Sequence, residues 1–290
     1  MVRTREQVPL TCDRPMDVHT PPPVEALVTD PEALLTHGYR QARDITRTHG
    51  TTYYWGTLFL PPQQRRDVYG LYALCRLADD IVDEPEKATG HGLDASLPPG
   101  ERLAQFEQRF QADLAAGRSD DPLFAAIVDT ARRLDLDSGC YDRFFGAMQL
   151  DLVRTSWASW PQLRDEYMEG SAAVIGEMML PVLRPRSREA AFAPARALGL
   201  AFQLADDIID LTGHPDVSGK IRGTDLREGV ATLPSILLRQ AAADGDAAAG
   251  VAPPPVPASF CVAGFASAGF ASPDLPVPSS PLSAPPLAPS

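Results

Sequence analysis

Apolar residues recur at intervals of three and four positions along most of this sequence, from about Asp30 to about Gln240. That spacing returns side chains to one face of an α-helix, and the strict alternation typical of a half-buried strand is scarce. Prolines divide the pattern into segments, and several stand where a first helical turn would begin, a position that tolerates their missing amide hydrogen. The pattern predicts an all-α protein, a single helical bundle over residues 30–240 with its site between facing helices.

The two ends of the chain lack this periodicity. Residues 1–29 are rich in proline and polar groups and predict a flexible leader. Residues 241–290 hold eleven of the 29 prolines and no Lys, Arg or His, which predicts a disordered tail. The change of character is abrupt, and a tail read outside the native reading frame would explain it.

Composition narrows the classes of function. The chain has 290 residues, 44% of them hydrophobic, enough for one large domain. Its net charge of −12 argues against nucleic acid as a partner, because a sequence-independent grip on phosphates needs clustered cations. The four cysteines are scattered, so we expect a cytoplasmic protein with neither a zinc knuckle nor a disulfide framework. No apolar stretch reaches the about 18 residues of a membrane span, although peripheral contact with the inner face of a membrane is compatible with the sequence.

An acidic cluster lies on the apolar face of the first strongly periodic helix. The residues that share one narrow arc of that helix are Val68, Tyr72, Cys75, Asp79 and Val82. Asp79 therefore points where the apolar stripe points, with Asp83 one turn beyond it and Asp80 to one side. An acidic helix end exposed to solvent is the alternative interpretation of this segment.

A second acidic cluster lies in a helix predicted over residues 198–211, which is apolar around most of its circumference. Such a helix is normally buried, so its polar wedge should face an internal cavity. The wedge consists of Gln203, Asp206, Asp207 and Asp210. Carboxylates about 6 Å apart repel by about 3 kcal/mol at an effective dielectric near 20, so the arrangement requires a cation between them.

Both clusters suit a hard divalent cation. Mg²⁺ prefers oxygen ligands and commonly bridges carboxylates to substrate phosphates, and Mn²⁺ is an alternative with the same preference. Two facing acidic helices would hold a diphosphate through Mg²⁺, which would neutralise the leaving group as an allylic carbon–oxygen bond ionises. A di-iron bundle would need Glu-x-x-His pairs, which the sequence lacks, and no Ser or Cys flanked by His suggests a nucleophilic triad.

Two segments carry a family resemblance: HGTTYYWGTLFLPPQQRRDVYGLYALCRLADDIVDE at residues 49–84 and YMEGSAAVIGEMMLPVL at residues 167–183. They resemble the bacterial phytoene synthases of the squalene/phytoene synthase family, over about residues 30–203. The resemblance implies an isoprenoid synthase type helical bundle with a central cavity. It also implies an Mg²⁺-dependent prenyltransferase that condenses two molecules of geranylgeranyl diphosphate head to head to phytoene, through a cyclopropyl diphosphate intermediate.

The resemblance also assigns roles to residues at matching positions. Asp79 and Asp83, with Asp80 beside them, resemble the first metal-binding motif, and Tyr167 resembles a catalytic aromatic residue that stabilises carbocation or proton-relay steps. The residues that resemble substrate-binding positions are His49, Thr51, Thr52, Tyr53, Tyr72 and Arg76. Ordinary core packing is the alternative for Tyr72 and Tyr167.

From Gln203 onward the sequence departs from that family. The segment DDIIDLTGHPDVSGKIRGTDLREGVATLP resembles the second aspartate-rich motif of the trans-polyprenyl diphosphate synthases. That resemblance implies Mg²⁺ ligands at Asp206, Asp207 and Asp210, of which Asp206 and Asp210 also occupy the second motif of the first family. It further implies substrate-binding roles for Gln203, Lys220 and Asp225. Our hypothesis is a hybrid chain joined near residues 198–204.

Three functions therefore stay open: a phytoene synthase, a head-to-tail trans-polyprenyl diphosphate synthase, and a degenerate diphosphate-binding bundle without activity. The phytoene synthase leads because the matching portion is longer. The prenyl chain length and the oligomeric state have no signature in the sequence.

Overall fold

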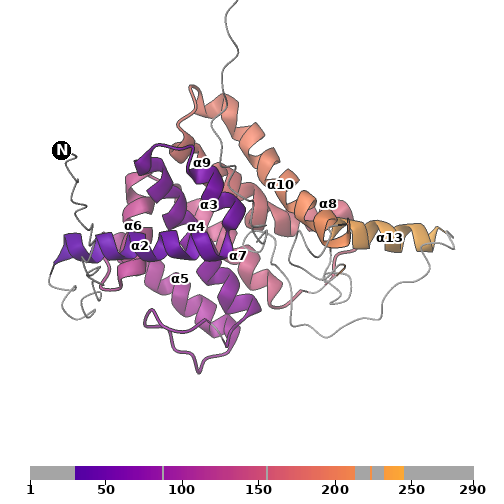
Figure 1. Cartoon of the computed structure of the whole chain (residues 1–290). Coiled ribbons are helices and arrows are strands. Elements are labelled where there is room, and N and C mark those ends of the chain that lie inside the picture. Colours follow the sequence, from indigo (N-terminus) through magenta and orange to yellow (C-terminus); the bar gives the residue numbers. More distant parts are fainter. Residues whose placement is uncertain (1–29, 87, 155, 213–222, 224–231, 245–290) are drawn as a thin grey trace, which may run out of the picture.

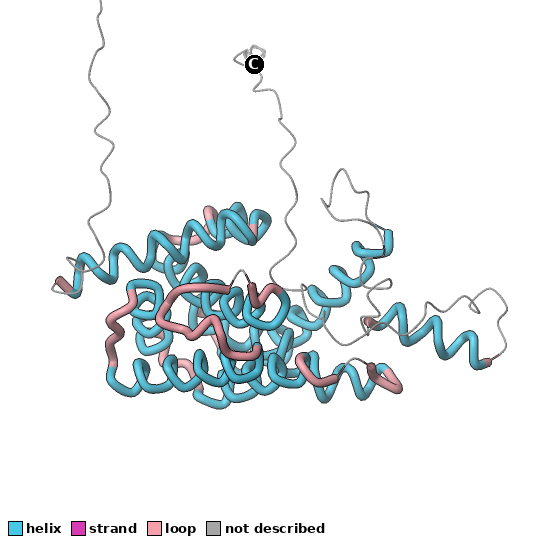
Figure 2. Tube along the Cα trace, turned by 90° about the horizontal axis from the view of Figure 1, so that it is seen from below, coloured by secondary structure: helices cyan, strands magenta, loops and turns pink. Residues whose placement is uncertain are grey.

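The structure of the 290-residue chain is a computed structural model that describes residues 30–86, 88–154, 156–212, 223 and 232–244. The predicted leader and almost all of the predicted tail lie outside these residues. Every element among the described residues is a helix, which confirms the all-α prediction (Figure 2). In chain order the elements are α2 (Pro31–His49), α3 (Thr51–Thr57), α4 (Pro62–Asp83), α5 (Pro99–Ala116), α6 (Pro122–Arg133), α7 (Ser138–Asp151), α8 (Trp160–Leu163), the π-helix η1 (Arg164–Ala173), α9 (Val174–Leu183), α10 (Arg188–Thr212) and α13 (Leu233–Ala243).

Proline and aspartate mark the helix starts. A proline occupies the first turn of α2, α4, α5 and α6, as the sequence pattern predicts. Asp30 caps α2 by accepting hydrogen bonds from the amides of Glu32 at 3.0 Å and Ala33 at 3.2 Å. Asp121 caps α6 in the same way, through the Phe124 amide at 3.0 Å. These residues satisfy or remove the amide groups that a first helical turn leaves open.

The core is built around α4, which contacts α2, α3, α5, α6, α7 and α9 (Figure 1). Its side chains Leu74 and Ile81 are each 1% exposed. The largest fully buried side chains of the surrounding helices include five phenylalanines, Phe106, Phe110, Phe124, Phe144 and Phe145. Because α4 is enclosed on most sides, the acidic motif near its C-terminal end sits on a rigid support.

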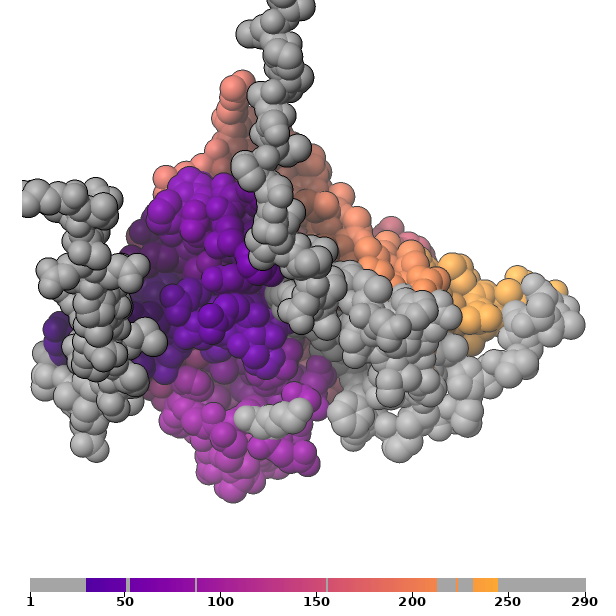
Figure 3. Space-filling view, viewed as in Figure 1, coloured from indigo at the N-terminus to yellow at the C-terminus, as the bar shows by residue number. Residues whose placement is uncertain are grey.

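The α10 helix lies along one edge of the bundle, against α9 and η1 (Figures 1 and 3). The prediction that it is buried on most sides is wrong, since Leu198 is 70% and Ile208 52% exposed. The inward orientation of its acidic wedge is confirmed for Asp207 and Asp210, which are each 5% exposed. Among the described residues, α13 is the element that follows α10 in the chain.

Candidate active site

Asp79 lies on the inward face of α4, as the helical wheel predicts. Tyr72 is 5%, Cys75 4% and Asp79 4% exposed, so the carboxylate continues a stripe of buried side chains. The Asp79 Oδ2 atom is buried and has no hydrogen-bond partner among the described residues. Burial raises the pKa of Asp79 to about 7, and the neighbouring Arg76 guanidinium opposes that rise. The exposed acidic helix end is therefore excluded for Asp79.

Two further carboxyl groups share the environment of Asp79. Burial raises the pKa of Asp83 to about 10, and the negative charges of Asp79 and Asp151 add to the effect. The pKa of Asp151, at the end of α7, is raised well above its ordinary value by burial and by Asp79. Asp83 Oδ1 also lacks a hydrogen-bond partner among the described residues. Three acidic groups thus meet in one buried region and oppose one another's ionisation.

Tyr167 joins this acidic group from the π-helix η1. Its hydroxyl donates a hydrogen bond to Asp151 Oδ2 at 3.3 Å, and its ring lies 5.9 Å from that of Trp157. The side chain is 7% exposed. A π-helix is rare in proteins and is frequently found at functional sites. Tyr167 therefore packs in the core with its ring and contacts the acidic group through its hydroxyl.

Arg76 and Asp80 form a pair at the edge of the acidic group. Their side chains make an ion pair within α4, and Arg76 Nη2 also lies 3.7 Å from Glu84 Oε2. The structure separates the two neighbouring aspartates, because Asp79 points inward and Asp80 is 22% exposed beside its arginine. The Arg76 charge lowers the pKa of Asp79 and of Asp83 and so opposes part of the rise that burial causes.

The second wall of the site comes from α10. Gln203 Nε2 donates a hydrogen bond to Asp207 Oδ1 at 3.3 Å, which fixes one side of the acidic wedge. Two tyrosines connect this wall to α4. The ring of Tyr53 lies 5.2 Å from Phe202 of α10 and 5.9 Å from Tyr72 of α4.

Each of the two tyrosines lies near an acidic residue of one helix. Burial raises the pKa of Tyr53, and the nearby Asp206 charge raises it further. Burial also raises the pKa of Tyr72, with a smaller contribution from Asp79 in the same direction. Each tyrosine therefore lies near an acidic residue of one wall, and the rings of the two tyrosines are neighbours. Tyr53 thus lies near Asp206 of the second acidic motif, and Tyr72 lies near Asp79 of the first.

The remaining predicted residues lie at the border of the site or outside the described residues. His49 ends α2 and Thr51 and Thr52 open α3, with Gly50 between them against the Tyr72 ring. A Cβ atom at Gly50 would come within 2.8 Å of that ring, so this position requires glycine's small size. Lys220 and Asp225 lie outside the described residues.

Sequence reasoning missed Asp151. The signal was present, because Phe144, Met148 and Asp151 follow the three- and four-residue spacing of one helix face. Phe144 is 2% and Met148 1% exposed, so the carboxylate again ends a buried stripe. The same rule that identified Asp79 identifies Asp151. Asp151 was missed because it has no adjacent aspartate, whereas the motifs on α4 and α10 each contain two aspartates in succession.

These carboxylates fit a bound divalent cation. Buried oxygen atoms without hydrogen-bond partners and mutually raised pKa values are what an acidic cluster shows when a positive charge must complete it. Among the described residues no three acidic, His or Cys side chains converge as a complete metal cage. Mg²⁺ usually binds through one or two carboxylates together with substrate phosphates and water, so a complete cage is not required.

An all-helical bundle with acidic motifs on α4 and α10 and tyrosines between them defines the isoprenoid synthase class of fold. Residues 46–260 match the squalene/phytoene synthase family, and the chain belongs to that family. The matched segment runs across residues 198–204, so the similarity to this family does not end at the join that the sequence suggested.

Curated relatives are phytoene synthases. The chain is 31% identical over 192 residues to 15-cis-phytoene synthase from Synechocystis sp., covering 62% of this chain and 54% of that protein. It is 29% identical over 240 residues to the chloroplastic phytoene synthase 1 of Arabidopsis thaliana, covering 81% and 52%. The chain therefore spans about half the length of these relatives.

Solved structures share the fold. Squalene synthase HpnC from Alicyclobacillus acidocaldarius superimposes with a TM-score of 0.56 at 26% identity, covering 71% of this chain and 69% of that one. A dehydrosqualene synthase superimposes with a TM-score of 0.54 at 21% identity, covering 76% and 77%, and supports the fold alone. No helix among the described residues is long and apolar enough to cross a bilayer.

Proposed function

We propose that the chain catalyses the head-to-head condensation of two molecules of geranylgeranyl diphosphate to phytoene, through a cyclopropyl diphosphate intermediate. The observation that carries the proposal is the meeting of Asp79, Asp83 and Asp151 in one buried region that faces α10 across Tyr53 and Tyr72. Membership of the squalene/phytoene synthase family supports the same reaction class.

In this proposal the carboxylates of the two walls bind the metal ions. Asp79 and Asp83 would hold Mg²⁺ on one wall, and Asp206 and Asp210 would hold it on the other. Bound Mg²⁺ supplies neutralisation of the leaving diphosphate as the allylic carbon–oxygen bond ionises. Asp80 and Asp207 support these ligands, because Asp80 pairs with Arg76 and Asp207 accepts from Gln203. Arg76 would contribute its charge to a diphosphate oxygen.

The aromatic residues would protect the cationic part of the substrate. The hydroxyl groups of Tyr53 and Tyr72 are protonated at neutral pH, as those of tyrosine ordinarily are, and burial moves each pKa further from neutrality. Ring faces attract a carbocation through their quadrupole, and an apolar lining excludes the water that would quench it. Tyr167 would orient a proton relay through the hydrogen bond to Asp151.

A head-to-tail polyprenyl diphosphate synthase is the second candidate. The buried position of Asp207 on α10 favours it, since Asp207 is the aspartate that the motif of that family adds to Asp206 and Asp210. A diphosphate-binding bundle without activity is the third candidate, supported by the open outer face of α10, where Leu198 is 70% exposed.

One product experiment separates these candidates. Purified protein with Mg²⁺ is given either geranylgeranyl diphosphate alone or an allylic diphosphate together with isopentenyl diphosphate. The proposed function yields a hydrocarbon of doubled carbon number from the first mixture. The second candidate yields a longer diphosphate from the second mixture, and a thermal response to Mg²⁺ and pyrophosphate without either product identifies the third.

We also propose that the reaction takes place in the cytoplasm with peripheral contact at the inner face of the membrane, which would receive an apolar product. The end of α3 and the connection to α4 support this, because Trp55 of α3 is 57% and Phe59 of the connection is 92% exposed. Gln64 Nε2 donates to the Val182 carbonyl at 2.8 Å, which brings this connection beside the exposed Leu183 and the arginines that follow it. Flotation with anionic and neutral vesicles tests the contact, and replacing Phe59 with Ser should abolish it.

A further inference from the structure

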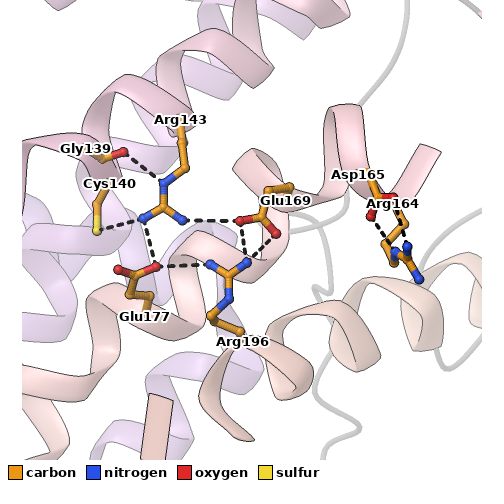
Figure 4. A network of polar contacts seen from close by, with 8 residues as sticks. All are labelled: Gly139, Cys140, Arg143, Arg164, Asp165, Glu169, Glu177 and Arg196. Atoms are coloured by element: carbon orange, nitrogen blue, oxygen red, sulfur yellow. Dashed lines mark hydrogen bonds and ion pairs between the residues drawn. The ribbon is translucent and has the colours of Figure 1, made fainter. Parts of the chain in front are cut away.

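Four charged side chains form a closed ring at the junction of α7, η1, α9 and α10 (Figure 4). Arg143 of α7 lies 3.3 Å from Glu169 Oε1 and 2.8 Å from Glu177 Oε2. Arg196 of α10 lies 3.1 Å from Glu177 Oε2 and donates to both carboxylate oxygens of Glu169. The charges alternate around the ring, so each arginine contacts both glutamates.

The π-helix brings the two glutamates of the ring to one face. An α-helix turns by about 100° per residue, so side chains eight positions apart would diverge by about 80°. The amide of Val174 donates to the carbonyl of Glu169, five positions earlier, and this widened turn accommodates one extra residue. With this extra residue, Glu169 and Glu177 are related as residues seven positions apart in a regular α-helix would be. The angle between their side chains around the helix axis then falls to about 20°. The π-register therefore brings Glu169 and Glu177 closer to one side of the helix than an α-helical register would, where both contact the same two arginines.

The ring also closes a tight contact between α10 and its neighbours. A Cβ atom at Gly176 would lie 2.0 Å from the Ala195 carbonyl oxygen, and one at Gly199 would lie 2.2 Å from the Ala172 carbonyl oxygen. The helices therefore approach backbone to backbone on both sides of Arg196. Asp206 follows on the same rigid helix, about 15 Å from Arg196 along the helix axis.

We infer that the ring of Arg143, Glu169, Glu177 and Arg196 is a positioning device for the active site. It fixes the π-register of η1, and with it the Tyr167 hydroxyl on Asp151, and it fixes the seating of α10, which carries the second acidic wall. These four residues are positioning residues, since all of them lie outside the carboxylate group itself. The inference rests on the proposed function for its catalytic consequence but not for its structural one.

The test compares Glu169→Gln with Asp165→Asn. Both substitutions remove one carboxylate from the same π-helix, but Asp165 pairs outward with Arg164 and takes no part in the ring (Figure 4). Glu169→Gln should raise the Mg²⁺ concentration needed for half-maximal pyrophosphate binding by about three- to tenfold, whereas Asp165→Asn should leave it unchanged. Hydrogen exchange at the Val174 amide should accelerate only in Glu169→Gln, because that amide reports the π-register.

Arg196→Lys keeps the charge but loses the planar fork that reaches two carboxylates, so it should show the same changes more weakly. This variant decides the matter if Glu169→Gln does not fold. Equal exchange rates and equal Mg²⁺ dependence in the ring and control variants would overturn the inference. An inactive wild type with accelerated exchange in Glu169→Gln would instead overturn the proposed function and leave the positioning role standing.

Discussion

The Tyr167 hydroxyl donates a hydrogen bond to Asp151 Oδ2 at 3.3 Å, which ties the π-helix to the end of α7 inside the acidic group. The contact joins Tyr167, which the family resemblance suggested as a site residue, to Asp151, which it did not suggest. Burial is the largest influence on the pKa of Asp151 and raises it, this hydrogen bond lowers it, and the Asp79 charge raises it by a smaller amount. Asp151 is thus a third carboxyl group whose ionisation depends on its neighbours.

Tyr167→Phe and Asp151→Asn should not be additive. Each single substitution removes one end of the same hydrogen bond, so the double variant should lose little more activity than the worse single variant. We expect each to lower kcat by about 10- to 100-fold, a typical range for a residue that positions a proton. A double-mutant cycle on phytoene formation measures this, and fully independent effects would show that the two side chains act separately.

The stability of the metal-free protein should fall as pH rises. The pKa of Asp79 rises from 3.8 to about 7 on folding, and that of Asp83 rises from 3.8 to about 10. The folded state therefore binds more protons than the unfolded state over this range, and the stabilisation present below the unfolded pKa is lost as pH rises through the folded pKa. Thermal unfolding at about pH 5 and pH 8 checks the sign.

Two conditions should remove that pH dependence. Mg²⁺ with pyrophosphate binds the ionised carboxylates, so it should stabilise the protein more at the higher pH. The Asp79→Asn, Asp83→Asn double variant should flatten the profile because the titrating groups are gone. A metal-free wild type that is more stable at the higher pH would contradict the buried, uncompensated state of these groups.

Asp67 offers a matched comparison for a buried carboxylate without a catalytic role. It is fully buried on α4 like Asp79, but it lies 2.6 Å from Arg133 Nη1 and accepts from Gln63 Nε2 at 3.1 Å. Asp67→Asn should lower the free energy of unfolding by about 2 kcal/mol and leave kcat near the wild-type value. Asp79→Asn should do the reverse, keeping the fold and abolishing turnover. Denaturant unfolding and the product assay, run on both variants, check the contrast.

Arg102 should hold the segment that follows the first acidic motif. Its guanidinium is almost fully buried and donates to carbonyl groups of that segment, at 2.6 Å to Ala95 and 3.0 Å to Leu97. Arg102→Lys replaces the planar fork by a single ammonium, so at least one carbonyl should lose its partner. Limited proteolysis should then cleave between residues 85 and 98 faster than in the wild type, and an unchanged cleavage rate would contradict this role.

Sequence periodicity was sufficient to predict which face of α4 is buried, because the spacing of its apolar residues selects a single face. Asp79 continues the stripe of Tyr72 and Cys75, and all three are buried. The spacing of apolar residues could not predict the buried face of α10, because apolar residues surround most of that helix and hydrophobicity does not select a face. Close backbone packing at Gly199 selects it instead, which leaves Leu198 exposed.

The π-helix was not predictable from the same pattern. Its widened turn is stabilised by contacts between segments far apart in sequence, among them the pairs of Glu169 with Arg143 and Arg196. The local spacing of residues does not indicate such contacts with residues far away in the sequence. Asp151 was missed for a different reason, since its position on a buried stripe can be read from the sequence once a single aspartate is treated as seriously as a doubled motif.

Calorimetric titration with pyrophosphate tests most directly whether two acidic walls share one ligand. The account predicts binding that requires Mg²⁺ and is lost both in Asp79→Asn, from the α4 wall, and in Asp210→Asn, from the α10 wall. Binding without Mg²⁺, or binding that survives removal of either aspartate, would contradict it.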